Sequence, residues 1–239
     1  MENAHKLKGK YLTFSYDDGV RQDIRLIEIF KTYGLKATFN LNSGTLGSVG
    51  HITHQGFDVC FDKVRPDEVG EVYKGFEVAC HGVMHRNFPE LDDAALDAEV
   101  CTDKRALEAL TGRPVIGGAY PCGVYDGQIS GRLRARGIHY CRTIKDTHGF
   151  SLPDDFNLWH PTCHDHDPAV FELAERFLAA DPEKLSVFYI WGHSFELDKN
   201  DCDRWYNIEK LCERLADRAD VKYVTGAEIF DQVKESEQK

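Results

Sequence analysis

The chain has 239 residues, 42% of them hydrophobic and 29% charged, which is enough for a sizeable buried core of ordinary composition. Its formal net charge is −11, with 29 basic against 40 acidic residues, and this balance argues against nucleic acid or an anionic membrane as a partner. No segment approaches the ~18 consecutive apolar residues that cross a bilayer, and the start, "MENAHKLKGK", lacks the apolar centre of a signal peptide. We therefore expect a cytoplasmic protein whose eight cysteines are reduced thiols.

Short apolar segments alternate with segments of helical periodicity along the whole chain. The segments that predict strands are residues 10–16, 36–41, 76–81, 115–120, 138–144, 158–164, 185–191 and 221–225. Apolar residues at helical spacing predict helices over residues 21–34, 92–112, 167–181 and 203–217. Repeated β/α units predict one α/β domain over residues 1–239, a distorted (β/α) barrel of seven to eight parallel strands with its core at residues 10–230. An open doubly wound sheet is the alternative, but no Gly-rich nucleotide-binding turn follows the first strand.

The Gly-rich segment 42–56 is expected to be an extended loop that overhangs the site. Its His51 and His54 are assigned no role beyond a contact with substrate. The last residues, 234–239, are expected to fray.

Polar residues follow five of the predicted strands at their C-terminal ends, where barrel enzymes place their chemistry. The first strand ends in the adjacent carboxylates Asp17 and Asp18, and later strands end in "CHGVMH", "AYPCG", "TCHDHD" and "WGHS". Because parallel strands share one rim, we expect these clusters to converge. Two adjacent carboxylates repel unless a cation, a proton or solvent relieves them, although a polar Asp-Gly turn is the simpler interpretation.

A metal ion would explain the carboxylate pair. His81 and His85 are four residues apart, so one helical turn would bring both rings to the same face. With Asp18 they form a set of two histidines and one carboxylate, which leaves positions open for water and substrate. Asp17 would then stay free to take a proton. The alternative is that the two histidines are incidental.

These motifs resemble those of the polysaccharide deacetylase family, the NodB-homology domain of carbohydrate esterase family 4, over residues 10–230. The family's T-F-D-D-G is matched by "TFSYDDG" with two residues inserted, and its H-[ST]-x-x-H by "HGVMH", with Gly82 in place of the hydroxyl residue. The third motif ends in P-x-G and is matched in part by "AYPCG". The family's last histidine follows an apolar strand, as His193 does in "FYIWGHS".

The resemblance implies a divalent metal, zinc first and Co²⁺, Ni²⁺ or Mn²⁺ as alternatives, that serves to hydrolyse an N- or O-linked acetyl group from a saccharide. By position, the family pattern makes Asp17 the general base and His193 the general acid. The metal ligands implied are Asp18, His81 and His85.

The third motif is expected to form the oxyanion and substrate site, through Tyr120, Pro121 and the backbone N–H of Cys122. A nucleophilic thiol at Cys122 is the less favoured interpretation. Trp191 is expected either to line the acetyl or sugar pocket or to belong to the core. Trp159 and Tyr120 are candidates for stacking on a sugar ring.

Two departures from the family pattern leave roles to fill. Ala119 stands where an arginine often orients the base, and Arg142 is the candidate replacement. The segment "HPTCHDHD" replaces the usual fourth motif, and Asp165 is the candidate to orient His193. Its three histidines, His160, His164 and His166, are alternatives for a second metal site, a substrate wall or a solvated loop.

Three functions stay open at this point. The intact metal set favours a deacetylase acting on an acetylated saccharide, and a soluble oligosaccharide or sugar precursor suits the expected cytoplasmic location. A metal-dependent amidohydrolase acting on a small non-sugar amide is the first alternative. A non-catalytic glycan-binding protein on the same scaffold is the second, and the presence of both Asp17 and His193 speaks against it. The sequence does not indicate the oligomeric state.

Overall fold

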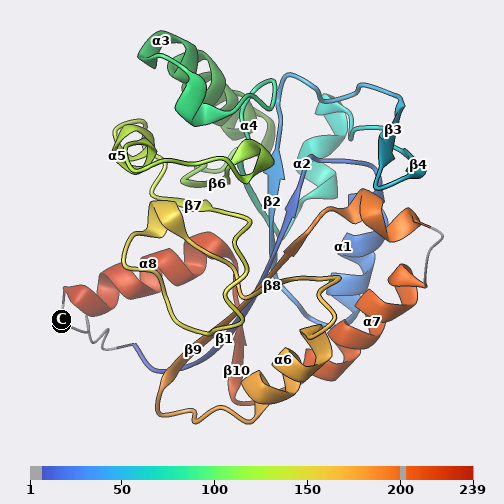
Figure 1. Cartoon of the computed structure of the whole chain (residues 1–239), viewed down its shortest axis with the longest axis vertical. Helices are drawn as coiled ribbons and strands as arrows, with labels where there is room; N and C mark the ends of the chain where they lie inside the picture. The colour runs from blue at the N-terminus through green and yellow to red at the C-terminus, as the bar shows by residue number, and fades with distance from the viewer. Residues whose placement is uncertain (1–6, 200–202, 239) are drawn as a thin grey trace.

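The computed structural model describes residues 7–199 and 203–238 (Figure 1). Within these residues one sheet of eight strands runs through the molecule, all pairs parallel. Its strands are β1 (Gly9–Asp17), β2 (Ala37–Leu41), β5 (Glu77–Cys80), β6 (Gly117–Ala119), β7 (Tyr140–Arg142), β8 (Cys163–His164), β9 (Leu185–Gly192) and β10 (Val221–Tyr223). The order is β7-β6-β5-β2-β1-β9-β8, and β10 also pairs with β1. Each strand lies within or overlaps one of the eight predicted segments, and the distorted barrel is confirmed.

The segment 158–164 connects the two edges of this curled sheet. Trp159 forms a parallel bridge with Arg142 of β7, and four residues later Cys163 pairs with Ile190 of β9. The single predicted strand 158–164 therefore pairs first with β7 and then with β9. This brings the ends of β7, β8 and β9 to one rim.

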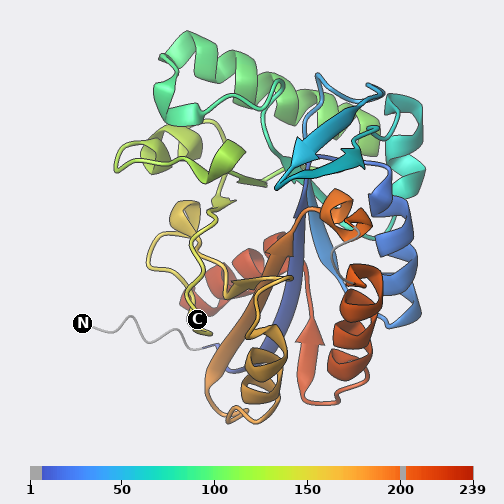
Figure 2. The same cartoon turned by 45° about the vertical axis from the view of Figure 1, so that its right-hand side comes forward.

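Helices cover the sheet, as Figures 1 and 2 show from two sides. They are α1 (Gln22–Thr32), α2 (Val69–Val72), α3 (Asp93–Leu96), α4 (Thr102–Thr111), α5 (Ile129–Arg134), α6 (Val170–Leu178), α7 (Arg204–Leu215) and α8 (Gly226–Glu237). The predicted helix 92–112 is composite: a π-helical turn, Asp97–Cys101, separates α3 from α4. No helix of residues 7–199 and 203–238 has the length and apolar character needed to cross a bilayer.

The C-terminal segment was expected to fray from residue 234, and this was wrong for the residues described. Helix α8 continues to Glu237. Its start is fixed by a capping box, in which Thr225 accepts from the Glu228 N–H and the Glu228 carboxylate accepts from the Thr225 N–H. Lys234 pairs with Glu237 in the last turn.

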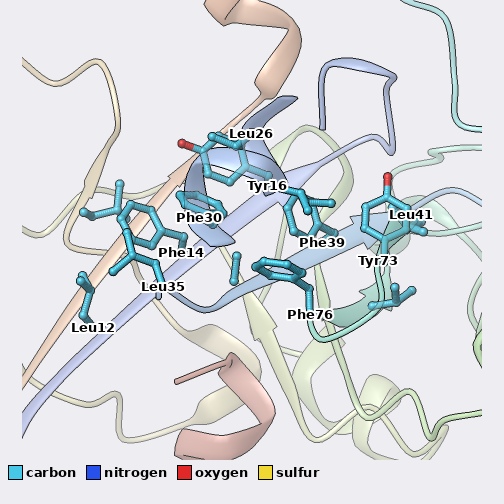
Figure 3. Close-up of a cluster of buried hydrophobic side chains, with 14 of the residues drawn as sticks. Leu12, Phe14, Tyr16, Leu26, Phe30, Leu35, Phe39, Leu41, Tyr73 and Phe76 are labelled. Carbon is cyan, nitrogen blue, oxygen red and sulfur yellow. The ribbon is translucent and has the colours of Figure 1, made fainter. Parts of the chain in front are cut away.

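Alternation along β1 divides the buried residues between the two faces of the sheet. Even-numbered Leu12, Phe14 and Tyr16 face the helices, where Phe14 packs on Phe30 of α1 with ring centroids 4.8 Å apart (Figure 3). Odd-numbered Tyr11 belongs to a second apolar cluster, together with side chains from β7, β9 and the connecting segment. Asp17 continues the odd-numbered series at the rim.

The second part of the Gly-rich segment, together with residues 57–60, forms a hairpin rather than the expected extended loop. Strands β3 (His51–His54) and β4 (Phe57–Cys60) pair antiparallel around Gln55 and Gly56, both with positive φ. Two central residues of positive φ give the turn that matches strand twist. The hairpin packs through Val59 on Phe195, beyond the end of β9.

Candidate active site

Asp17 lies at the end of β1 with its carboxylate in the middle of a polar cluster. It is 2% exposed. Asn40 of β2 donates to Oδ1 at 2.8 Å, and the Arg142 guanidinium of β7 donates to Oδ2. Oδ2 also lies 3.9 Å from Nε2 of His81 and 3.9 Å from Nε2 of His193. Four strands thus supply the surroundings of one carboxylate.

Arg142 holds Asp17 in its ionised form. The guanidinium is buried and fixed from three other directions: it donates to Ser15 Oγ at 3.1 Å and to the Thr143 carbonyl at 3.0 Å, and it stacks 4.6 Å from the Trp191 ring. Burial by itself would raise the pKa of Asp17. The lowering effect of Arg142 and the nearby histidines is larger, so the pKa lies well below its ordinary value. Asp17 is therefore a carboxylate at neutral pH.

Asp18, His81 and His85 come together as a group with one donor atom from each within 4.8 Å of the others. The backbone places them by unusual turns, because Asp18 has φ 81°, Gly82 φ 80° and His85 φ 57°. Glycine suits position 82 for a second reason: a Cβ there would lie 2.9 Å from a carboxylate oxygen of Glu99. The departure from the family's hydroxyl residue thus fits this backbone.

His81 is arranged as a neutral imidazole with one free nitrogen. Its Nδ1 lies 2.8 Å from the Ala119 carbonyl, an acceptor, which places the proton on Nδ1 and leaves Nε2 as a lone-pair donor. Burial lowers the pKa of His81, with smaller opposing effects from Asp17 and Asp18. A neutral ring with a buried, fixed orientation is the form that binds a metal ion.

Lys63 is a cation of the site that the sequence did not indicate. Its Nζ donates to the Asp18 carbonyl at 2.7 Å, lies 3.6 Å from Asp18 Oδ1 and sits 4.0 Å over the Phe61 ring. Burial raises the pKa of Asp18, whereas Lys63 and the histidines lower it to a net value below the ordinary one. The two adjacent carboxylates therefore each have their own cation, Arg142 for Asp17 and Lys63 for Asp18.

His193 follows β9 and lies between two carboxylates. Its Nε2 is 3.9 Å from Asp17, and its Nδ1 is 4.0 Å from Oε2 of Glu196. Glu196 lies in the 3₁₀ helix η6 (Ser194–Asp198), is 4% exposed and was not singled out from the sequence. Burial raises its pKa, but the surrounding histidines and Lys199 lower it to about 2.

A sequence model of the family described as polysaccharide deacetylase matches residues 4–141, more than half of the chain. The chain belongs to the polysaccharide deacetylase family. This confirms the resemblance drawn from the motifs and makes the protein an enzyme of the carbohydrate esterase 4 deacetylase group. No curated protein matches the sequence.

Solved deacetylase structures share the fold. A Mycobacterium smegmatis protein solved as a candidate polysaccharide deacetylase has a TM-score of 0.68 at 16% identity, over 96% of this chain and 92% of that one. The Xyl-CE4 domain of a multidomain xylanase from the hindgut metagenome of Trinervitermes trinervoides has 0.58 at 16%, over 94% and 91%. A family 4 carbohydrate esterase from Streptomyces lividans, solved with acetate, has 0.54 at 14%, over 87% and 89%. Such low identities show a common fold alone.

In this polysaccharide deacetylase, the acid expected to orient the last histidine lies elsewhere. Asp165 was the candidate, but it accepts from the Tyr16 hydroxyl at 2.6 Å and contacts His164 and His166 instead. Tyr16 is on the helix side of β1, so Asp165 is on that side too, whereas His193 approaches Asp17 on the barrel side. Among the described residues, Glu196 is the carboxylate near His193 Nδ1, with its Oε2 4.0 Å away and no hydrogen bond between the two side chains.

Two aromatic residues expected to stack on substrate are buried in the deacetylase core. Tyr120 is 1% exposed and its hydroxyl donates to the Asn157 carbonyl at 2.7 Å. Trp159 is also 1% exposed and packs on Tyr189 with ring centroids 4.7 Å apart. Tyr125, whose ring lies 5.9 Å from that of Tyr120, is accessible instead.

Trp191 belongs to the site as well as to the buried interior. Its Nε1–H donates to Asp146 at 2.7 Å, and its ring contacts Arg142 on one side and the His164 and His193 rings at 4.6 and 5.7 Å. With 7% exposure it forms a floor behind Asp17 and His193.

The third motif forms a short 3₁₀ turn, η4 (Pro121–Gly123). Pro121 is buried, and Cys122 is exposed with φ 54°. Burial of the sulfur and nearby carboxylates raise the pKa of Cys122, which disfavours a thiolate nucleophile. The role of this turn in holding an oxyanion stays a prediction.

The histidines outside the family motifs separate into different surroundings. His160 contacts Thr143 through Nδ1 at 2.7 Å, and exposed His51 pairs with Asp58 on the hairpin. His54, from the same hairpin, reaches Glu196 at 3.1 Å. The His164 and His166 rings lie 5.3 Å apart, and Nε2 of His164 is 3.1 Å from Oε2 of Glu196.

Proposed function

We propose that this protein hydrolyses an acetyl group from a saccharide, with a divalent metal ion as its cofactor. The observation that supports this most directly is the position of Asp17. One oxygen of its carboxylate lies 3.9 Å from Nε2 of His81 and 3.9 Å from Nε2 of His193. Asp17 therefore stands between the group of Asp18, His81 and His85 and the histidine proposed as acid.

The group of Asp18, His81 and His85 fits a metal ion by its chemistry. It offers two imidazole nitrogens and one carboxylate oxygen, a set that leaves coordination positions for water and substrate. The hydrogen bond from His81 to the Ala119 carbonyl directs the remaining nitrogen into the group. Zinc is the first expectation, and Co²⁺, Ni²⁺ or Mn²⁺ would accept the same ligands. When bound, such an ion polarises an acetyl carbonyl and lowers the pKa of water.

Asp17 is proposed as the general base. Because Arg142 keeps it ionised, its carboxylate can accept the proton of an attacking water molecule, and Asn40 and Arg142 hold it in place. Arg142 would thus replace the arginine that the third motif lacks at Ala119. It reaches the carboxylate from β7 instead.

His193 is proposed as the general acid. Its Nε2 faces the same region as the Asp17 carboxylate, and its Nδ1 lies 4.0 Å from Oε2 of Glu196. The proton on Nε2 could pass to the leaving nitrogen or oxygen of the sugar as the bond to the acetyl carbon breaks. Acid and base would then act on the same acetyl group.

The turn at buried Pro121 and exposed Cys122 is proposed as a contact for the acetyl oxygen, and Trp191 as a further part of the substrate site. An acetylated saccharide is favoured as substrate by membership of the deacetylase family. A small non-sugar amide and a non-catalytic glycan-binding role remain the alternatives. The presence of both Asp17 and His193 beside the three possible ligands favours catalysis.

The test combines metal content with acetate release. Protein purified without added metal, stripped with a chelator and reloaded with Zn²⁺, would be assayed on N-acetylated and O-acetylated sugars and on simple acetamides. We expect one metal equivalent lost in a His81→Ala/His85→Ala double variant, and acetate released from a sugar only when metal is present. Turnover of acetamides alone would favour an amidohydrolase. Sugar binding with zinc but no turnover would favour a binding protein.

A further inference from the structure

A second group of possible metal ligands lies beside His193, and three of its four members have no role in the proposed reaction. His164 is in β8, Asp165 and His166 follow it directly, and Glu196 comes from η6 after β9. One donor atom from each of these four side chains lies within 4.8 Å of the others. The His164 and His193 rings are 6.3 Å apart, so the group is adjacent to the first site but separate from its ligands.

In each carboxylate of the group, one oxygen contacts residues outside the group and the other oxygen faces the histidine nitrogens of the group. Asp165 accepts the Tyr16 hydroxyl at Oδ2, while its Oδ1 faces Nδ1 of His164 at 3.0 Å and Nδ1 of His166. Glu196 contacts His54 and Lys199 through Oε1, at 3.1 and 3.3 Å. Its Oε2 lies 3.1 Å from Nε2 of His164. Such outer contacts are what orient ligands around a metal ion.

The backbone is adapted to bring these groups together. Gly192 ends β9, and a Cβ at that position would lie 2.7 Å from Oδ2 of Asp165. Only glycine therefore lets the Asp165 carboxylate approach this strand. His164, His166 and Glu196 also line a cavity of about 320 Å³, which gives an ion and water access to the group. Nε2 of His166 is buried and has no hydrogen-bond partner among the described residues.

We propose that His164, Asp165, His166 and Glu196 form a second site for a divalent transition-metal ion. The two carboxylates of the group carry two negative charges, which one divalent cation balances. Four protein ligands complete a tetrahedron, the arrangement of structural zinc sites, whereas the three ligands of the first site leave it open. The second ion would join the end of β8 to η6 and hold Glu196 against His193.

Counting bound metal tests this directly. Wild-type protein would be stripped with a chelator, reloaded with Zn²⁺ or Co²⁺, desalted and measured by mass spectrometry, and Co²⁺ absorption would report tetrahedral coordination. We expect two equivalents in wild type and one in His166→Ala or Glu196→Gln. The His81→Ala/His85→Ala double variant should also keep one. His160→Ala, which alters a nearby histidine outside the group, should keep two.

The outcomes for the two sites are distinguishable. One equivalent in wild type that is lost with His81 and His85 but kept in His166→Ala would overturn the second site and leave the proposed reaction intact. The reverse pattern would support the second site and remove the metal from the proposed reaction. Two equivalents in both His166→Ala and Glu196→Gln, with folded protein by circular dichroism, would also overturn the second site.

Discussion

The Arg142 guanidinium donates to the Asp17 carboxylate although the two residues are 125 positions apart in the chain. The contact crosses the barrel mouth from β7 to β1, and both side chains are almost fully buried. A buried ion pair contributes little net stability when intact, but removal of one partner leaves a charge without compensation. The low pKa of the proposed base therefore depends on the packing of β7 near β1, which places Arg142 beside Asp17.

Arg142→Ala should shift the acid limb of the pH–rate profile. The pKa of Asp17 is low mainly because Arg142 opposes the effect of burial, so the variant should raise that pKa and move the acid limb of kcat/KM to higher pH. Arg142→Lys keeps the charge but not the forked geometry and should shift the limb less. An acid limb that stays in place in Arg142→Ala would mean that Asp17 is not the group titrating.

The same variant should lose stability in a pH-dependent manner. Breaking a buried pair costs about 3–5 kcal/mol. Because the folded-state pKa of Asp17 is depressed, the contribution of the pair is present above the unfolded pKa of about 3.9 and is lost as pH falls toward the folded pKa. Urea unfolding should therefore show a difference between wild type and Arg142→Ala at pH 7 that narrows in acid. A constant difference across pH would contradict this.

Asp17→Asn should abolish most turnover while metal stays bound. The amide cannot accept the proton of an attacking water molecule, and loss of general base catalysis typically costs about 10²–10⁴-fold in rate. Asp17 is not in the group of Asp18, His81 and His85, so metal content by mass spectrometry should not change. Wild-type rates of acetate release in Asp17→Asn would rule out the proposed base.

His193→Ala should matter most for substrates with poor leaving groups. An amino sugar must be protonated as it leaves, whereas 4-nitrophenolate leaves without a proton. We expect the rate on an N-acetylated sugar to fall by about 10²–10⁴-fold and the rate on 4-nitrophenyl acetate to fall much less. Equal losses on both substrates would point to a role for His193 other than general acid.

Lys63→Met should make the protein more dependent on metal. Removing the ammonium leaves the buried Asp18 carboxylate without its cation, which a metal ion at the same carboxylate can replace. A ligand that binds only the folded state stabilises it by mass action. The increase in Tm on adding Zn²⁺ should thus be larger in Lys63→Met than in wild type or in the exposed control Lys8→Met. An equal increase in all three proteins would argue against a metal ion at Asp18.

Asp23→Asn should remove one source of pH-dependent stability. Asp23 in α1 is fully buried and accepts from the Ser194 and Tyr73 hydroxyls at 2.6 and 2.7 Å. Burial raises its pKa to about 7, despite the opposing effect of these hydrogen bonds. The folded state then binds a proton that the unfolded state releases near pH 4, so this contribution is complete below pH 4 and is lost as pH rises to about 7.

Chemical unfolding at several pH values would measure this effect. Wild-type protein should lose a few kcal/mol more than Asp23→Asn between about pH 4 and pH 7. Parallel stability curves for the two proteins would show that Asp23 does not take up the proton.

The barrel could be predicted from the sequence because its strands are short apolar segments that alternate with segments of helical periodicity. Both patterns are local properties of the sequence. The shorter helices α2 and α5 were missed because four to six residues carry too little periodicity. The hairpin at 51–60 was missed as well, because Gln55-Gly56 is not one of the Asn-Gly, Asp-Gly or Gly-Gly pairs that mark such turns.

The site could be predicted only in part. Asp17, His81 and His193 could be singled out because each lies at or just after the end of a strand, and parallel strands bring their ends to one rim. Lys63 and Glu196 come from segments whose position depends on tertiary packing, and nothing local marks them. Asp165 was assigned to the wrong partner because the face of the sheet on which a rim residue lies depends on backbone details beyond the strand.

The polar contacts that hold the β3–β4 hairpin beyond the end of β9 are those of His54 with Glu196, Gln55 with Lys199 and Gln22 with the Cys60 carbonyl. Its strands pair only with each other and contribute nothing to the eight-stranded sheet. The hairpin can therefore vary in length without breaking a hydrogen bond of the sheet that carries Asp17. Residues 51–60 are therefore a suitable segment in which to change substrate selectivity while the sheet and the residues of the candidate site are kept.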